Sequence, residues 1–225
     1  MRLSSRSSEL ELLDAPELDP VDLRINLREM GMLNRLPGGV EASVKAVLGA
    51  LDGRADASVL DIGAGSGDFA RRLGGRRRLR LLVGDSRPEV LDIARRTLSR
   101  TPDVDFLLAD VTALPLPDGS VDVVHASLLL HHLEPSAVVD ALREMRRVAR
   151  EAVVVNDLRR GRIAYLMAVA PIYAFTRGRY TRVDGPASAR RAYTLYELDS
   201  LAAQAGLRVV SRTLPWWPRV TTVYR

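Results

Sequence analysis

The stretch VLDIGAGSGDFA, from Val59 to Ala70, decides the fold expected for this chain. Its apolar start, through Ile62, is typical of a strand buried in a parallel sheet. The glycines at positions 63, 65 and 67 predict a sharp turn, because glycine tolerates positive φ and lets a ligand approach the backbone closely. Phe69 and Ala70 then begin a helix, whose N-terminus presents free N–H groups. A strand–glycine turn–helix unit of this kind suits a nucleotide-like ligand.

The spacing of these glycines argues against a pyrophosphate. The dinucleotide fingerprint is G-x-G-x-x-G, and here the third glycine comes one residue early. Asp61, just before the turn, would repel a pyrophosphate but could pair with an ammonium group. The spacing therefore disfavours an NAD site. The alternative to a ligand-binding turn is a tight turn that binds no ligand.

Composition narrows the class of protein further. The length of 225 residues predicts one domain with an appended lid. The chain has no cysteine, which excludes disulfides and thiolate zinc sites and fits a cytoplasmic location. No apolar run reaches the ~18 residues of a membrane span. The net charge is +5, but Lys45 is the only lysine and the arginines are scattered, so we expect no nucleic-acid partner.

The order of the elements predicts a doubly wound α/β sheet. Residues 1–18 are expected to form a flexible arm, and residues 19–52 an N-terminal helical cap. Residues 53–225 are expected to form the main domain, with a lid at about 161–192. Strands are predicted to end at Ile62 and to cover 79–83, 104–108, 121–126, 152–155, 207–214 and 220–224, the last two joined as an antiparallel hairpin. Ser86 and Glu89 predict a capping box after the second strand.

Three of the predicted strands end in a carboxylate. These residues are Asp61, Asp85 and Asp110. A doubly wound sheet gathers the carboxyl ends of its strands at one edge. Asp85 lies 22 residues after Gly63, near the ~20 expected for an acid that binds a ribose. Asp110 would then lie near the adenine. A single such aspartate is usually only a turn residue, but three beside a glycine loop predict a site.

With these residues in view, the chain resembles the class I methyltransferases that use S-adenosylmethionine (SAM). The resemblance rests on D-x-G-x-G-x-G at Asp61, on Asp85, on Asp110-Val111, and on LPLPDGSVDVV followed by HASLLLHHLEP. Leu116 and Val121 stand where the family's phrase has aromatic residues. The match spans about residues 57–157 and is most similar to the ubiquinone/menaquinone-biosynthesis type, while the tail resembles a bacterial natural-product subgroup.

The resemblance implies a Rossmann-like, seven-stranded sheet with an antiparallel last strand. It also implies SAM as the cofactor and S-adenosylhomocysteine (SAH) as its product. The resemblance implies nine cofactor residues: Asp61, Gly63, Gly65, Asp85, Ser86, Asp110, Val111, Ala126 and Ser127. Ala64 and Arg87 are added because they neighbour these positions. Arg35, beside Asn34, is added as a candidate for the methionine carboxylate. Ala126 and Ser127 would line the methyl group. No metal site is expected.

Histidines suggest how an acceptor hydroxyl would lose its proton. His125 lies inside the fourth predicted strand, where a hydrogen-bonded core role is expected. His131 and His132 follow that strand, and Asp157 ends the fifth. Related O-methyltransferases carry a histidine and an aspartate at the positions of His131 and Asp157. We therefore take His131 as the candidate general base, Asp157 as its orienting partner and His132 as a further candidate, although the histidines could instead only close the cofactor site.

The expected function is methyl transfer from SAM to the hydroxyl of a small, aromatic or polyketide-like acceptor. Residues 163–175 read as an apolar lid over that acceptor, and Asp184, Ser188, Arg190, Arg191 and Tyr193 could add polar contacts. Trp216 and Trp217 read as hairpin-tip packing. The alternatives are an RNA-modifying methyltransferase, C-methylation of a quinone-type ring, and a SAM-binding homologue without transfer. The sequence is compatible with a homodimer and does not fix the oligomeric state.

Overall fold

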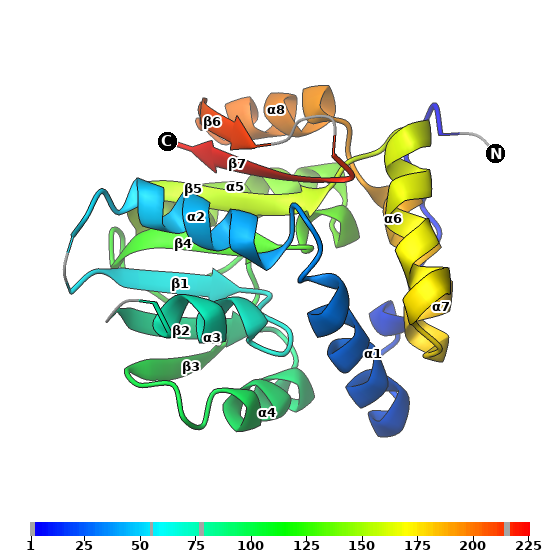
Figure 1. The fold of residues 1–225 in the computed structure, drawn as a ribbon. Helices are drawn as coiled ribbons and strands as arrows, with labels where there is room; N and C mark the ends of the chain where they lie inside the picture. Colours follow the sequence, from blue (N-terminus) through cyan, green and yellow to red (C-terminus); the bar gives the residue numbers. More distant parts are fainter. Residues whose placement is uncertain (1–2, 55, 77–78, 214–216) are drawn as a thin grey trace.

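In the computed structural model, which describes residues 3–54, 56–76, 79–213 and 217–225, one sheet organises the chain (Figure 1). The strands of these ranges are β1 (Ser58–Ile62), β2 (Arg80–Asp85), β3 (Val104–Leu108), β4 (Val121–Ser127), β5 (Ala149–Leu158), β6 (Val209–Thr213) and β7 (Arg219–Tyr224). Their spatial order is β3-β2-β1-β4-β5-β7-β6. Strands β1 to β5 are parallel, and β7 is antiparallel to both β5 and β6. The predicted doubly wound sheet with an antiparallel last strand is confirmed.

Helices cover both faces of this sheet. They are α1 (Pro20–Leu33), α2 (Val40–Ala50), α3 (Asp68–Gly74), α4 (Pro88–Thr97), α5 (Pro135–Val148), α6 (Arg162–Phe175), α7 (Arg179–Arg191) and α8 (Leu195–Gln204), with short 3-10 turns η1 (Leu12–Asp14) and η2 (Leu130–His132). Alternate residues of a strand face opposite sides. Accordingly, Val59 packs with the apolar faces of α2, α3 and α4, and Leu60 packs with those of α5 and α8. Among the described residues, no helix has the length and apolarity that a membrane crossing needs.

Two local predictions need correction. The helix α4 begins at Pro88 with Arg87 as its N-cap residue, so the predicted capping box of Ser86 and Glu89 is wrong. Proline fits the first helical position because its missing N–H is unpaired there anyway, and this places the start of the helix one residue later than predicted. Strand β5 also runs beyond the predicted 152–155 at both ends, because it is hydrogen-bonded on both sides, to β4 and to β7.

The glycine turn after β1 has the predicted backbone. Gly63, Gly65 and Gly67 have φ of +66°, +55° and +79°. Gly67 is the N-cap residue of α3, and a Cβ atom there would lie 2.8 Å from Cδ1 of Leu98. The turn therefore needs glycine for its backbone angle and for the close packing of α4 against α3.

We expect Gly67→Ala to lower the free energy of unfolding by about 1–3 kcal/mol, because alanine is strained at this φ. Gly49→Ala is the matched control. Gly49 lies in α2 with nothing within 4 Å of an added Cβ, so this change should leave stability the same or raise it by about 0.5 kcal/mol. Urea unfolding of both variants measures the difference. Equal stabilities would show that the turn tolerates a side chain.

The N-terminal segment and the lid lie together at the carboxyl edge of the sheet. Helix α7 packs against α6, α1 and η1 (Figure 1). The segment predicted as a flexible arm is hydrogen-bonded to the rest of the chain from residue 3 onward, where Nε of Arg160 donates to the Leu3 carbonyl at 3.3 Å. Arg6 donates to the carbonyls of His131 and Leu133, and the backbone N–H groups of Leu12 and Leu13 donate to the Asp184 carboxylate. The N-terminal segment is thus packed against α7, which is part of the predicted lid.

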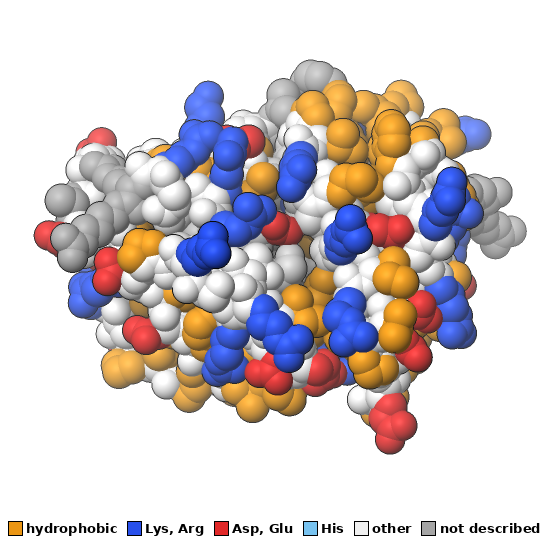
Figure 2. Space-filling view, turned by 60° about the horizontal axis from the view of Figure 1, so that its bottom comes forward, with side chains coloured by type: hydrophobic (Ala, Val, Ile, Leu, Met, Phe, Trp, Pro, Cys, Tyr) orange, Lys and Arg blue, Asp and Glu red, His pale blue; other side chains and the backbone are white. Residues whose placement is uncertain are grey.

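Cationic side chains are distributed rather than gathered on the face drawn in Figure 2. Lysine and arginine side chains there stand among acidic and apolar ones. This matches the scatter of arginines along the chain.

Candidate functional site

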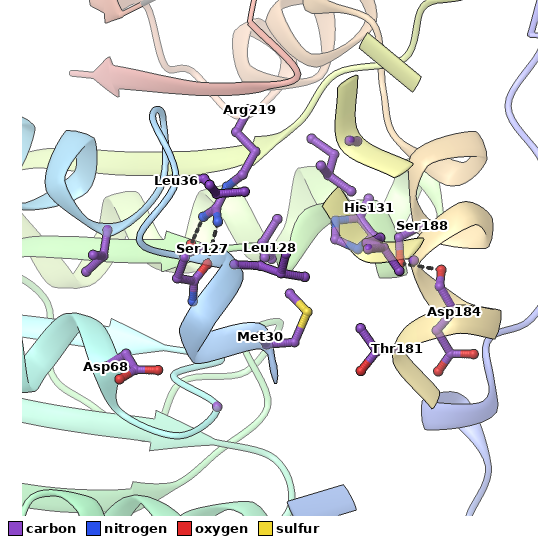
Figure 3. A pocket seen from close by; sticks show the side chains of 18 of the residues that line it. Met30, Leu36, Asp68, Ser127, Leu128, His131, Thr181, Asp184, Ser188 and Arg219 are labelled. Carbon is purple, nitrogen blue, oxygen red and sulfur yellow. Dashed lines mark hydrogen bonds between the residues drawn. The ribbon is translucent and has the colours of Figure 1, made fainter. Parts of the chain in front are cut away.

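A cavity of about 610 Å³ lies between the carboxyl edge of the sheet and the helices α1, α6 and α7 (Figure 3). Most of its wall is apolar, with Leu27 and Met30 from α1 and Met167 and Ile172 from α6. Polar residues enter from the strand ends, the glycine turn and the N-terminal segment. They include Glu11, Asp61, Ser127, His131, Asp184 and Arg219. A mostly apolar cavity of this size with a few polar groups is typical of a small-molecule site.

The glycine turn forms one end of this cavity. Gly63, Ala64 and Gly65 line it together with Asp61. The Asp61 carboxylate is 3% exposed, and its Oδ1 lies 2.7 Å from Nδ1 of His125. Its Oδ2 is buried and finds no hydrogen-bond partner within the described part of the chain. A buried carboxylate oxygen that lacks a donor fits a cationic ligand group.

His125 has the core role predicted for it. Its ring is fully buried and stacks on Phe69 with a centroid distance of 3.7 Å. Since its Nδ1 faces Asp61, His125 holds that carboxylate in place behind the cavity wall.

Asp85 reaches the glycine turn from the end of β2. Its carboxylate accepts from the backbone N–H of Gly65 at 3.3 Å and from that of Arg87 at 3.1 Å. Burial raises the pKa of Asp85 above its ordinary value. The Arg87 guanidinium is engaged elsewhere, because it donates to the carbonyls of Leu13 and Ala15. Arg87 therefore ties the N-terminal segment to the end of β2.

Several predicted cofactor residues do not line this cavity, namely Asp85, Ser86, Arg87, Asp110, Val111, Ala126 and Arg35. Ser86 is exposed. The Asp110 carboxylate accepts from the N–H and hydroxyl of Thr112. Val111 and Ala126 are buried in the core on the α5 side, so at the end of β4 only Ser127 lines the cavity. Arg35 is exposed, whereas Asn34 lines the wall. The chain turns at the end of α1, and neighbouring side chains there point in different directions.

His131 and Asp157 form a buried pair, as the sequence predicts. Nδ1 of His131 lies 2.5 Å from Oδ1 of Asp157, and Oδ2 accepts from the backbone N–H of Leu130 at 2.8 Å. Burial opposes ionisation of Asp157, but its hydrogen-bonded pairing with His131 holds the pKa of Asp157 below the usual range. An anionic acceptor at Nδ1 selects the tautomer with the proton on Nδ1. Nε2 is then the free base of a histidine that lines the cavity.

His132 belongs to a second polar group, formed with the N-terminal segment. Its Nδ1 lies 3.6 Å from Oε2 of Glu11 and 3.5 Å from Oδ1 of Asp14. Ser188 donates to the same Glu11 oxygen at 2.8 Å, and Arg191 forms an ion pair with Asp14. Of the predicted lid contacts, Asp184 and Ser188 line the cavity, while Arg190, Arg191 and Tyr193 do not.

Glu11 is a cavity residue that sequence reasoning missed. Its side chain is 1% exposed, and Oε1 has no hydrogen-bond partner among the residues that the structure describes. In the sequence it lies in a polar, acidic stretch that gives no sign of burial. Nothing short of the fold brings residue 11 beside residues 131 and 132.

The burial of Glu11 makes stability depend on pH. Burial raises its pKa from 4.5 to about 6. A carboxyl whose pKa is raised by folding destabilises the folded state once it ionises, so the penalty grows from pH 4.5 to 6 and is full above that. We expect Glu11→Gln to gain about 2 kcal/mol of stability relative to wild type between pH 4.5 and about pH 7.5.

Urea unfolding across this pH range measures that difference. Glu9→Gln is the control, because Glu9 forms an exposed ion pair with Arg190 and its difference from wild type should stay flat. A Glu11→Gln difference that does not change with pH would contradict the assignment.

Glu11, His131 and His132 offer ligand atoms within 4.8 Å of one another. The sequence predicts no metal site, and this grouping was not foreseen. The Arg191 guanidinium lies 3.7 Å from Oε1 of Glu11, so a cation already faces this carboxylate.

The hairpin tip also contributes to the wall. Trp216 lies outside the described residues. Trp217 lines the cavity, and its Nε1 donates to the carbonyl of Pro37 at 2.6 Å. Arg219, two residues later, was not predicted as a site residue and lines the cavity as well.

Comparison with known proteins identifies relatives of the central part of the chain. Residues 59–152 match the family model described as a methyltransferase domain. The chain is 39% identical over 114 residues to an uncharacterized 37.1 kDa protein in transposon Tn4556 of Streptomyces fradiae, which covers 48% of this chain and 32% of that protein. It is 36% identical over 105 residues to the ubiquinone/menaquinone biosynthesis C-methyltransferase UbiE of Hahella chejuensis, which covers 43% and 40%. The chain thus spans less than half the length of these relatives.

Solved structures extend the likeness to nearly the whole chain. A SAM-dependent methyltransferase from Aquifex aeolicus superposes with a TM-score of 0.63 at 19% identity, covering 92% of this chain and 98% of that one. A TehB-like SAM-dependent methyltransferase from Corynebacterium glutamicum gives a TM-score of 0.64 at 14% identity, covering 92% and 98%. The fold is therefore the Rossmann-like fold of SAM-dependent methyltransferases.

Proposed function

We propose that this chain transfers the methyl group of SAM to a hydroxyl oxygen of a small, aromatic or polyketide-like acceptor. One observation carries the proposal: a single cavity is lined by the glycine turn after β1 and by the buried His131 of the His131–Asp157 pair. The methyltransferase-domain match and the fold support the transfer and its cofactor.

The residues around the glycine turn fit the parts of SAM. Asp61 has a buried oxygen without a donor at the cavity wall, which suits the ammonium of the methionine tail. Asp85 lies at the end of the next strand, and its carboxylate suits the two ribose hydroxyls. The positive φ at Gly63 and Gly65 opens the backbone on this side. When bound, SAM supplies an electrophilic methyl group on a sulfonium.

The other residues of the cavity would align and deprotonate the acceptor. Nε2 of His131 takes the hydroxyl proton as the oxygen attacks. Asp157 accepts from Nδ1 and stabilises the imidazolium that forms, as a carboxylate does behind a histidine base. The apolar walls from α1 and α6 would exclude water from the cavity. They would also hold the acceptor with its oxygen aligned with the methyl group.

C-methylation of a ring carbon is the second candidate. The curated match to a C-methyltransferase favours it. In that case His131 would ionise a ring hydroxyl, and the adjacent carbon would attack. A cavity of about 610 Å³ roofed by helices suits a small molecule in either case.

The experiment is an assay of SAH formation with ¹³C-methyl SAM and a panel of phenols, hydroxyquinones and hydroxylated aromatic acids. Carbon NMR of the product distinguishes an O-methyl from a C-methyl group. SAH formed with an O-methylated product supports the proposal. Binding of SAM without SAH formation from any acceptor would favour a homologue that only binds the cofactor.

A further inference from the structure

Arg219 begins β7 and directs its guanidinium into the cavity toward Ser127 (Figure 3). Its Nε donates to Oδ1 of Asn156 at 3.2 Å, and Nη2 donates to the Ser127 hydroxyl at 2.9 Å. Nη1 donates to Oδ1 of Asn34. All three partners are neutral oxygens. They fix the orientation of the guanidinium without neutralising its charge.

Arg219 is half-buried. The two arginines of the described residues that are almost fully buried are paired with acids. Arg160 is bonded to Glu197 at 2.6 Å, and Arg191 forms an ion pair with Asp14. Within the part of the chain that the structure describes, no carboxylate lies within ion-pair distance of Arg219. The nearest acidic influence is that of Asp157, and burial still lowers the pKa of Arg219 to about 10. A cation that is partly removed from water and lacks a counter-ion is unfavourable, so an anion bound here would be stabilised.

The geometry leaves donors for such an anion. The hydrogen bonds use one hydrogen on each guanidinium nitrogen, so each terminal nitrogen keeps a second N–H. Two parallel N–H groups of an arginine match the two oxygens of a carboxylate. We propose that Arg219 binds the carboxylate of a molecule held in the cavity. The inference rests on the proposed function for the identity of that molecule.

Two molecules could bring a carboxylate to this position: the acceptor, or the methionine tail of SAM. In the sheet order, β4 and β5 separate β7 from β1, and the glycine turn follows β1. Arg219 also contacts Ser127, at the end of β4. Because β4 pairs with β1 in the register Ile62↔Ala126, Ser127 lies level with the start of the glycine turn. The position of Arg219 is therefore compatible with both sources, and the titrations below distinguish them.

Isothermal titration of the full chain and of Arg219→Gln separates the two sources. The first matched pair of probes is SAH and 5′-methylthioadenosine, which lacks the amino-acid tail. The second pair is 4-hydroxybenzoate and 4-hydroxybenzamide, titrated with SAH and without it. For an acceptor anchor, wild type should prefer the acid over the amide, and Arg219→Gln should lose about tenfold to a hundredfold in affinity for the acid alone. For a cofactor anchor, the same loss should affect SAH and spare methylthioadenosine.

Thermal unfolding without ligand adds a readout that needs no probe. Arg219→Met should lower the melting temperature by less than its control does, because loss of the hydrogen bonds to Asn34, Asn156 and Ser127 is offset by removal of a partly buried charge. The matched control is Arg212→Met on β6, which removes an ion pair with Asp199 and should melt at the lower temperature of the two.

The proposal is overturned if Arg219→Gln binds the carboxylate probe of each pair with the same affinity as wild type, relative to the neutral probe. These titrations measure binding only. A chain that binds carboxylates through Arg219 but forms no SAH would overturn the proposed transfer and leave this anchor standing.

Discussion

Replacing His131 by alanine is expected to lower kcat by about 10²–10⁴-fold, the range that a positioned general base supplies. Affinity for SAH should change little, because His131 is bonded to Asp157 and not to the glycine turn. The measurement is the rate of SAH formation at neutral pH, with SAH binding followed by titration. Asp157→Asn should also lower kcat, since an amide no longer stabilises the imidazolium or selects its tautomer.

His132→Ala is the matched control for this prediction. The ring of His132 lies beside that of His131, tilted by 34° at a centroid distance of 4.3 Å, but its Nδ1 faces Glu11 and Asp14. It should therefore retain a kcat well above that of His131→Ala. A His131→Ala enzyme with normal turnover at neutral pH would remove the base from the mechanism.

Replacing Asp85 by asparagine is expected to weaken SAH binding by about tenfold to a hundredfold. Hydrogen bonds to a charged group contribute about 1.5–3 kcal/mol each, and each 1.4 kcal/mol is about tenfold in affinity. The asparagine oxygen can still accept from the Gly65 or Arg87 N–H group that Asp85 holds now, so the turn should keep its shape. Isothermal titration with SAH measures the loss.

Asp92→Asn serves as the control for Asp85. Asp92 is an exposed residue of α4 whose Oδ1 lies 3.5 Å from Arg95, and exposed ion pairs contribute little. Its SAH affinity should equal that of wild type. An Asp85→Asn protein that binds SAH as tightly as the control would show that the ribose is held elsewhere.

Much of the fold could be predicted because it depends on local pattern. Apolar runs such as Val121–Ala126 predicted the strands, and the spacing of Val138, Leu142 and Met145 predicted α5. Boundaries were less accurate where tertiary contacts decide them, as in β5, which continues through Asn156 and Asp157 because β7 pairs with it. The predicted capping of α4 by Ser86 was wrong because Pro88 takes the first helical position, which makes Arg87 the N-cap residue.

The candidate site divides in the same way. Periodicity reveals the strand ends, so the neighbourhood of several site residues could be foreseen. Asp61, Asp85 and Asp157 lie at the ends of β1, β2 and β5, and the glycines and His131 follow β1 and β4. Their roles as site residues stay predictions until the variants are measured. Asp110 and Arg35 show the limit of this reasoning, because a strand end or helix end gives a residue's location but not the direction of its side chain.

The sequence by itself determined the sheet, the glycine turn and the edge at which polar residues gather, because those features follow from residue periodicity and from backbone angles that few residues adopt. Only the tertiary structure decided that Glu11 lies beside two histidines more than a hundred positions away, and that Arg219 faces the cavity with no acid of the described residues paired to it. Burial and pairing depend on long-range packing, and no local pattern of residues records which distant side chains share a wall.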